Sequence, residues 1–251
     1  MRVLSIGNSF SQDATWYLHG IASAAGREIE TWNLYIGGCS LYRHAKNLRG
    51  GLREYSLEIN GQGTAEQVSV NEIAEKGGFD AVTLQQASHY SGLPETYDPF
   101  LEELASYLRK TLPEAKLYIH ETWSYDPDST HDGFPVYAMS SELMYEKLAA
   151  AYRRAAEKIG AGFLPVGDGI EALRKTALFA PRTGKYPVNR DGFHLSVPSG
   201  RIFAGYIWAE RLLGLDVRGN SFRPGTAALS PEPEAWCLMQ EIAHEIAAKE
   251  K

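Results

Sequence analysis

The sequence has little cysteine, no long apolar run and no excess of positive charge. Its two cysteines, Cys39 and Cys237, are too few for a disulfide framework or a four-cysteine zinc site. Nothing in it is apolar for long enough to span a bilayer, and Gly7-Asn8-Ser9 interrupts the N-terminal apolar run too early for a signal peptide. A formal net charge of −6 leaves no surplus of Lys and Arg for a nucleic-acid surface. These absences predict a cytoplasmic chain that binds neither membranes nor nucleic acid, although a trimmed secretion signal would leave no trace.

What is present is the composition of an ordinary globular protein. Of the 251 residues, 44% are hydrophobic and 22% are charged, which is far from the range of disordered chains. Neither a repeat nor a low-complexity tract interrupts the sequence. We therefore expect one domain over residues 1–251, with one continuous core.

Strand-like and helix-like segments alternate along the chain. The expected strands are residues 3–6, 28–36, 79–86, 116–123 and 161–168. Helices are expected from Ser9 to Gly26, at 70–76, after Asp98-Pro99, at about 141–159, and near 168–177, 197–213 and 234–249. This alternation predicts βαβ units and an α/β fold, a flavodoxin-like three-layer α/β/α sandwich with a parallel sheet of about five strands. The Asn60-Gly61 pair predicts a hairpin, as a small excursion from that sheet.

Glycine and polar residues follow the expected strands. Ser9 follows the first strand, Gly37-Gly38 the second, Gln85 to His89 the third, and His120-Glu121 the fourth. Ligands of open parallel sheets bind beyond the carboxyl ends of the strands. We therefore expect these residues to share one edge of the sheet.

Ser9 and the pair Asp191 and His194 each have two interpretations. Ser9 is either the N-cap of the helix that follows it or a nucleophile. Asp191 and His194, three residues apart, are either a helix cap and a buried histidine or the acid and base of a catalytic triad. Each pattern is weak alone, but together they supply every group that acyl transfer by a serine requires.

The chain resembles the SGNH (GDSL-type) hydrolases, in a divergent branch that begins "IGNSFS". The resemblance covers nearly the whole chain and implies a serine esterase. It implies Ser9 as nucleophile, Gly38 as a backbone oxyanion donor, and Asp191 with His194 as the rest of the triad. No metal or organic cofactor is implied.

Two blocks depart from the family pattern. Asn8 stands where the family has an aspartate, and "LQQASH" replaces the block that ends GxND, so the expected oxyanion asparagine is missing. Gln85 is the preferred substitute, because its side-chain amide can donate the same N–H, with Gln86 and His89 as alternatives.

The remaining candidates lie around the fourth strand. Trp123, Glu121 and His120 are expected to contact substrate, whereas Trp32 is expected in the core and Cys39 as a small packing residue. The acids and histidines of "HETWSYDPDSTHDG" do not have the spacing of known metal motifs, so the segment is interpreted as a polar loop over the site.

Three functions remain open from the sequence. The first is a serine esterase that removes a short acyl group, such as acetyl, from a small molecule or a glycan. The others are a catalytically silent module that binds a glycan or small molecule on the same fold, and an acyltransferase. The sequence does not specify an oligomeric state.

Overall fold

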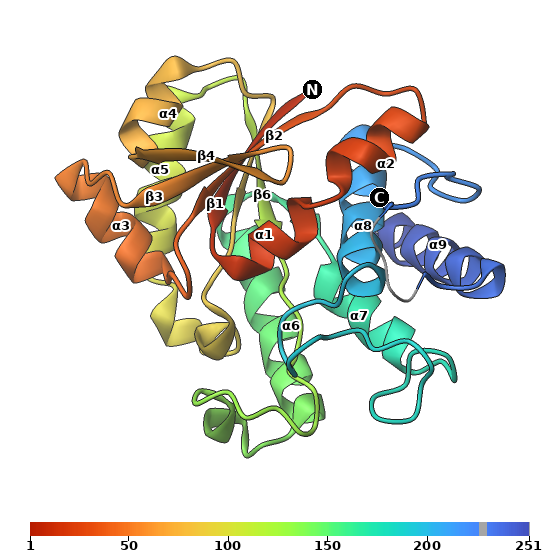
Figure 1. The fold of residues 1–251 in the computed structure, drawn as a ribbon. Coiled ribbons are helices and arrows are strands. Elements are labelled where there is room, and N and C mark those ends of the chain that lie inside the picture. The colour runs from red at the N-terminus through yellow and green to blue at the C-terminus, as the bar shows by residue number, and fades with distance from the viewer. Residues whose placement is uncertain (226–229, 251) are drawn as a thin grey trace.

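The computed structural model describes residues 1–225 and 230–250, and its centre is a seven-stranded sheet (Figure 1). The strand order is β4-β3-β2-β1-β5-β6-β7. The strands are β1 (Arg2–Gly7), β2 (Glu30–Tyr35), β3 (Tyr55–Ile59), β4 (Gln62–Val68), β5 (Ala81–Leu84), β6 (Lys116–His120) and β7 (Gly162–Leu164). Five strands, β2, β1, β5, β6 and β7, pair in parallel as predicted.

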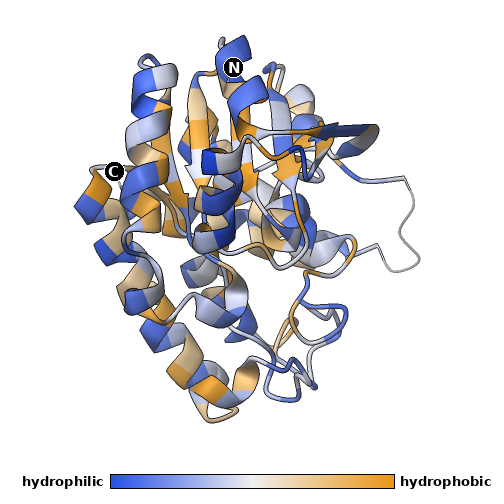
Figure 2. Cartoon of the chain, turned by 90° about the vertical axis from the view of Figure 1, so that its left-hand side faces the viewer, coloured by the Kyte–Doolittle hydropathy of each residue, from blue (hydrophilic) through white to orange (hydrophobic). Residues whose placement is uncertain are grey.

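The first strand occupies the middle of the seven-stranded sheet, and it is apolar on both faces. The side chains of Val3, Leu4 and Ile6 are fully buried. A parallel sheet must be covered on both faces. Figure 2 shows hydrophobic strands flanked by helices that carry both hydrophilic and hydrophobic residues. The carboxyl end of β1, where Ser9 follows, therefore opens at the centre of one sheet edge.

Helices form the two outer layers. They are α1 (Ser9–Thr15), α2 (Leu18–Ala24), α3 (Leu41–Gly50), α4 (Val70–Lys76), α5 (Phe100–Thr111), α6 (Ser141–Ile159), α7 (Val166–Arg174), α8 (Ser199–Leu213) and α9 (Pro233–Ala248). Helix α8 contacts α1, α2, α7 and α9 on one face, while α5 contacts α3, α4 and α6 on the other. Among the described helices, none combines the length and the apolarity needed to cross a membrane.

The hairpin at Asn60-Gly61 forms as predicted, but it belongs to the sheet. Asn60 and Gly61 both have positive φ, at 51° and 75°, as this turn requires. Strand β3 pairs antiparallel with β2, so the hairpin adds two strands at one edge. The expectation of an excursion from a five-stranded sheet was wrong, because β2 offers β3 an unpaired edge.

Helix boundaries differ from prediction in three places. The helix expected from Ser9 to Gly26 is two helices, separated at Trp16 and Tyr17. Helix α3 was not predicted, and β7 stops at Leu164 because α7 begins at Val166, directly after Pro165. In contrast, the helix at 70–76 has the predicted bounds and the predicted capping box.

Candidate active site

Ser9 is the first residue of α1, and the N-cap of that helix is Asn8. The Asn8 side-chain oxygen accepts a hydrogen bond from the Phe10 N–H at 3.0 Å. Interpreting Ser9 as the cap is therefore wrong, since the cap position is already filled by its neighbour. The Ser9 hydroxyl is free to meet a partner from elsewhere in the chain.

That partner is His194. Its Nε2 lies 2.9 Å from Ser9 Oγ, although the two residues are 185 positions apart. On the other side of the ring, His194 Nδ1 lies 2.7 Å from Asp191 Oδ2. The structure thus brings serine, imidazole and carboxylate into one hydrogen-bonded row, in the order that nucleophile, base and acid require.

Asp191 is held as an ionised carboxylate. Its other oxygen, Oδ1, accepts the backbone N–H groups of His194 at 2.8 Å and Phe193 at 3.2 Å. Partial burial raises the pKa of Asp191, but the hydrogen bonds from the ring and backbone of His194 outweigh burial, and the net pKa is below its ordinary value. The carboxylate therefore stays charged, caps no helix, and fixes His194 with a proton on Nδ1.

The segment that carries these residues is a narrow ribbon, residues 189–195, which we call the base turn. Its ends pair as an antiparallel bridge between Asn189 and Leu195, and Arg190 N–H donates to His194 O at 2.8 Å. Gly192 has φ +86°, and a Cβ there would meet the Ser129 backbone at 3.0 Å. Glycine is needed here both for the turn and for this close approach.

The turn that contains Gly38 is tied to Asn8, the residue before Ser9. Asn8 Nδ2 donates to Cys39 O at 3.0 Å and so fixes the turn after β2. Gly38 has φ +62°, with open space where a Cβ would be. Among the described hydrogen bonds, none uses the backbone N–H of Gly38 or of Ser9. Both donors are available to an oxyanion.

Gln85 is linked to the same turn through a row of buried amides. His120 Nδ1–H donates to Gln85 Oε1 at 2.7 Å, and Gln85 Nε2 donates to Asn8 Oδ1 at 2.7 Å. We call His120, Gln85 and Asn8 the polar relay. It fixes which end of the Gln85 amide faces α1, and it leaves the second N–H of Gln85 Nε2 without an assigned acceptor.

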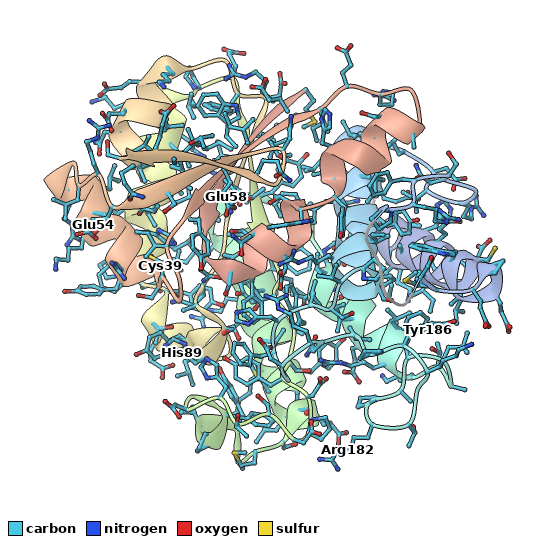
Figure 3. The ribbon with its side chains drawn as sticks, viewed as in Figure 1. Cys39, Glu54, Glu58, His89, Arg182 and Tyr186 are labelled. Atoms are coloured by element: carbon cyan, nitrogen blue, oxygen red, sulfur yellow. The ribbon has the colours of Figure 1, made fainter. Side chains whose placement is uncertain are left out.

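The two alternatives to Gln85 have other partners. Gln86 Nε2 donates to the backbone and side-chain oxygens of Thr96, both at 3.0 Å, while its Oε1 accepts from Leu41 N and Ala87 N. Its amide is consumed, so Gln86 has no N–H left for an oxyanion. His89 lies in a short helical turn after β5, half-buried, with its ring against Tyr90 (Figure 3).

Comparison with known proteins gives a family and a fold. The family described as "Domain of unknown function (DUF4886)" matches residues 2–235. The crystal structure of a DUF4886 family protein from Bacteroides uniformis is 33% identical, with a TM-score of 0.90 over 100% of this chain and 96% of that one. The chain belongs to the DUF4886 family.

More distant structures show that the DUF4886 protein has the fold of SGNH hydrolases. A candidate SGNH hydrolase from Slackia heliotrinireducens is 24% identical, with a TM-score of 0.59 over 84% of this chain and 98% of that one. An acetylxylan esterase from Geobacillus stearothermophilus is 13% identical, with a TM-score of 0.54 over 86% and 95%. Among curated protein sequences, none matches. The predicted resemblance to a divergent SGNH branch is confirmed, at the level of fold.

Three residues expected to contact substrate are buried in the DUF4886 protein. Trp123, His120 and Glu121 are each 0% exposed, so this expectation was wrong. The Trp123 ring stacks on Phe10, with 4.3 Å between centroids, and its Nε1 donates to Phe193 O at 2.7 Å. Trp123 therefore joins the residue after Ser9 to the residue before His194.

Burial also sets the charge of His120 and Glu121. Desolvation lowers the pKa of His120 to about 3 and raises the pKa of Glu121 well above its ordinary value. Glu121 Oε2 accepts the Asp168 backbone N–H at 2.8 Å, which anchors the start of α7. Burial thus favours the neutral form of both side chains, and because neither is exposed they hold structure and do not contact a substrate.

Cys39 and Trp32, which were expected to pack in the interior, are buried and partly buried respectively. Cys39 is 1% exposed beside α3 (Figure 3), and burial raises its pKa to about 12, so it is not a thiolate nucleophile. Trp32 is partly buried, with its ring edge-on to Phe79 at 5.8 Å.

The acids and histidines of residues 120–132 do not converge as metal ligands would. Asp126 pairs with Arg174 at 2.8 Å, and the His131 ring packs edge-on against Phe193 at 4.8 Å. Among the described residues, ligand atoms converge within 4.8 Å at Glu210, Asp216 and His244. There His244 is hydrogen-bonded to Glu210 at 2.9 Å and Asp216 pairs with Arg218 at 2.6 Å, so these ligand atoms already have protein partners.

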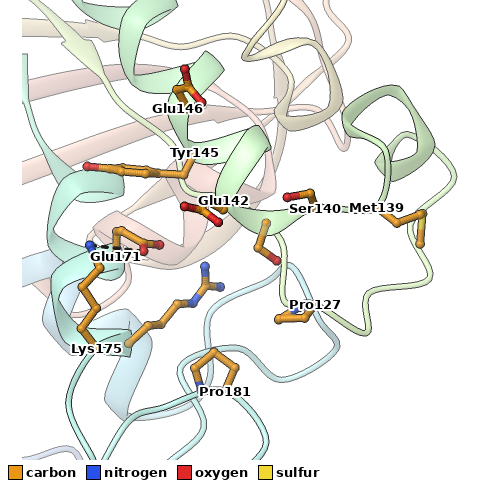
Figure 4. Close-up of a pocket in the computed structure, with 11 residues that line it drawn as sticks. Pro127, Met139, Ser140, Glu142, Tyr145, Glu146, Glu171, Lys175 and Pro181 are labelled. Carbon is orange, nitrogen blue, oxygen red and sulfur yellow. Dashed lines mark ion pairs between the residues drawn. The ribbon is translucent and has the colours of Figure 1, made fainter.

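A cavity of about 840 Å³ lies between the first turns of α6 and the end of α7 (Figure 4). Tyr145, Glu142 and Glu171 line it, and the triad does not. Pro127 at its rim follows Asp126, whose backbone N–H donates to Gly192 O at 2.7 Å. The cavity wall therefore also supports the base turn.

Sequence reasoning missed the buried ions that flank the triad. Asp13 is fully buried, and it pairs with Arg190 and Arg201. A signal was present, because Asp13 follows Ser9 by one helical turn on a helix whose other periodic residues are apolar, and an arginine directly precedes Asp191.

Proposed function

We propose that the DUF4886 protein is a serine esterase that hydrolyses a short-chain acyl ester, with acetylated carbohydrate as the substrate class. The observation that carries the proposal is the continuous row from Ser9 Oγ through His194 to Asp191, with contacts of 2.9 and 2.7 Å. These are the contacts by which a base activates a hydroxyl and a carboxylate stabilises the resulting imidazolium.

The reaction has two halves. His194 Nε2 takes the Ser9 proton as Oγ attacks the ester carbonyl, and the same proton then passes to the leaving alcohol. The resulting acyl-enzyme is hydrolysed by a water that His194 deprotonates in turn. The oxyanion of each half is stabilised by the N–H groups of Ser9 and Gly38 and by the Gln85 amide.

The carbohydrate part of the proposal is drawn from the fold relative described as an acetylxylan esterase. It is tested by a panel of acetylated xylooligosaccharides beside p-nitrophenyl acetate, butyrate and octanoate. We expect acetyl esters to be hydrolysed faster than longer esters. An octanoate preference would reject the short-chain assignment.

The esterase assignment is tested at Ser9. A fluorophosphonate probe should label the wild-type protein, and Ser9→Ala should abolish both labelling and hydrolysis of p-nitrophenyl acetate. Ser69→Ala, which removes a helix cap on α4 far along the chain, is the matched control and should retain both. Turnover that survives in Ser9→Ala would reject the nucleophile, and an unlabelled wild type that binds glycans without turnover would favour the binding module.

A further inference from the structure

Helix α1 touches the base turn at two places that are one helical turn apart. Ser9 meets His194, and Asp13, four residues further along α1, accepts the backbone N–H of the next residue, Leu195, at 2.8 Å. Residues at i and i+4 lie on the same helix face. Two consecutive residues of the base turn are thus matched to two consecutive turns of the nucleophile helix.

The Asp13 carboxylate is completely buried and fully used. Oδ1 accepts from Arg201 Nε at 2.8 Å and from Arg190 Nη1 at 3.0 Å, and Oδ2 accepts from Leu195 N. A buried charge is stabilised only by its partners, so the loss of any one of these contacts leaves the desolvated carboxylate less well compensated.

Two of the partners lie on opposite strands of the base turn. Arg190 directly precedes Asp191, and Leu195 directly follows His194. Arg190 Nη1 also donates to Leu195 O, so one guanidinium nitrogen bridges both strands and the carboxylate. The third partner, Arg201, belongs to α8 and lies over the Trp16 ring at 4.0 Å, which anchors the carboxylate to the helical layer.

We propose that Asp13 is a positioning residue that sets the distance between the Ser9 hydroxyl and the His194 ring. The proposal rests on the proposed function for its catalytic consequence. Asp13 touches no reacting atom, and it acts by tying the two strands of the base turn to the helix that carries the nucleophile. Misplacement of a catalytic group by about 1 Å can cost about 10²-fold in rate.

The decisive variants are Asp13→Asn and changes at Arg190. Asparagine keeps the size of the side chain but removes the charge that holds two guanidinium groups. All the contacts of Arg190 with Asp13 and Leu195 leave from the single nitrogen Nη1, so a lysine ammonium can replace them. Asp168→Asn is the matched control. Asp168 lies on α7, is partly buried, and likewise pairs with an arginine, Arg153 of α6.

We expect Asp13→Asn to lower kcat about 10²-fold and Arg190→Gln about 10-fold, with KM changed by less than about twofold. Arg190→Lys should recover most of the kcat lost in Arg190→Gln, and Asp168→Asn should retain kcat. A purely structural role would not produce this split between kcat and KM or the rescue by lysine. Folded Asp13→Asn and Arg190→Gln variants with kcat near wild type would overturn the proposal, and Arg190→Gln alone decides if Asp13→Asn does not fold.

A second measurement separates this proposal from the esterase assignment. Amide hydrogen exchange of residues 189–195, measured by mass spectrometry, reads the attachment of the base turn without any substrate. Exchange should quicken at least several-fold in Asp13→Asn relative to Asp168→Asn. Inactive wild-type protein would reject the esterase, and the exchange comparison would still decide the tie, with equal exchange in both variants counting against it.

Discussion

Polar side chains at the carboxyl edge of the sheet form two groups with opposite exposure. In the triad, the side chains of Asp191 and His194 are 42% and 21% exposed. In the polar relay and its neighbour Glu121, every residue is at most 2% exposed. Both groups contain a histidine and carboxyl or amide groups, so residue type alone does not separate them. Solvent access does.

The buried group orients the exposed one, and among its members only Gln85 is proposed to take part in the reaction. A histidine whose pKa is lowered to about 3 by burial cannot act as a base that cycles near neutral pH, but it can hold a glutamine amide in one orientation. The relay therefore reaches from β6 to the turn after β2, through Asn8 and its contact with Cys39, the residues that flank the proposed oxyanion donors Ser9 and Gly38.

The largest effect should come from the exposed group, at Asp191. Asp191→Asn should lower kcat by about 10³–10⁴-fold, because the neutral amide neither fixes the required tautomer nor stabilises the imidazolium. Steady-state kinetics with p-nitrophenyl acetate measure it. Asp132→Asn, at an exposed acid on the loop above, is the control and should retain activity; a comparable loss there, or near-normal turnover in Asp191→Asn, would contradict the assignment.

The same carboxylate predicts the acid side of the pH profile. The net pKa of Asp191 is lowered in the folded protein, so its stabilising contribution is fully present above the ordinary value of about 3.9 and is lost as the pH falls through the lower folded value. Asp191 should therefore stay ionised between pH 4 and 7, so its protonation should not contribute to any decline of kcat/KM in that range. A two-proton decline in that range would contradict it.

The next effect compares two adjacent glutamines. Gln85→Ala should lower kcat by about 10²–10³-fold with little change in KM, because an oxyanion donor acts in the transition state. Gln86→Ala removes an amide that holds Thr96 and Leu41, so it should chiefly lower the free energy of unfolding, by about 1–3 kcal/mol. Denaturant unfolding and kcat, measured on both variants, test this, and a reversed pattern would move the oxyanion role away from Gln85.

Local signals in the sequence predicted much of the fold because their causes are local. The apolar residues of β1 and the capping box of Ser69 with Glu72 act within a few positions, and both elements formed where expected. The α/β/α sandwich followed from the alternation of such segments. The attachment of the hairpin to β2 was not predicted, because it depends on a free strand edge that exists only in the assembled sheet.

The sequence predicted which residues gather at the site, but not which of them are exposed and which are buried. The family motifs predicted that Ser9 and His194 meet at one edge of the sheet. Whether a residue that follows a strand is exposed to solvent depends instead on which other segments cover it. Glu121 is covered by α7, where a Cβ at Gly167 would lie 3.0 Å from the Glu121 side chain. Trp123 is covered through Phe10 and the base turn. These are contacts between segments distant in sequence, and no spacing rule encodes them.

A smaller effect is expected at Trp123, which contacts both Phe10 beside Ser9 and Phe193 beside His194. Trp123→Phe keeps an aromatic ring against Phe10 and removes the N–H that holds Phe193 O, so kcat should fall about 10-fold with KM nearly unchanged. Trp32→Phe, at a partly buried ring that packs on Phe79, is the matched control and should keep kcat. A rise in KM with normal kcat in Trp123→Phe would instead restore Trp123 as a substrate contact.

The smallest effect on turnover should come from Glu121. Its folded pKa is raised, so its contribution to stability is most favourable below the ordinary value of about 4.3 and declines as the pH rises toward the folded value. Glu121→Gln keeps an oxygen to accept the Asp168 N–H and has no proton to lose, so it should be more stable than wild type at pH 8 and equally stable near pH 4. Its kcat should stay within about twofold of wild type. Thermal unfolding at pH 4 and pH 8 measures the stability, and steady-state kinetics measure kcat. A folded Glu121→Gln variant that had lost turnover would show that Glu121 takes part in the reaction.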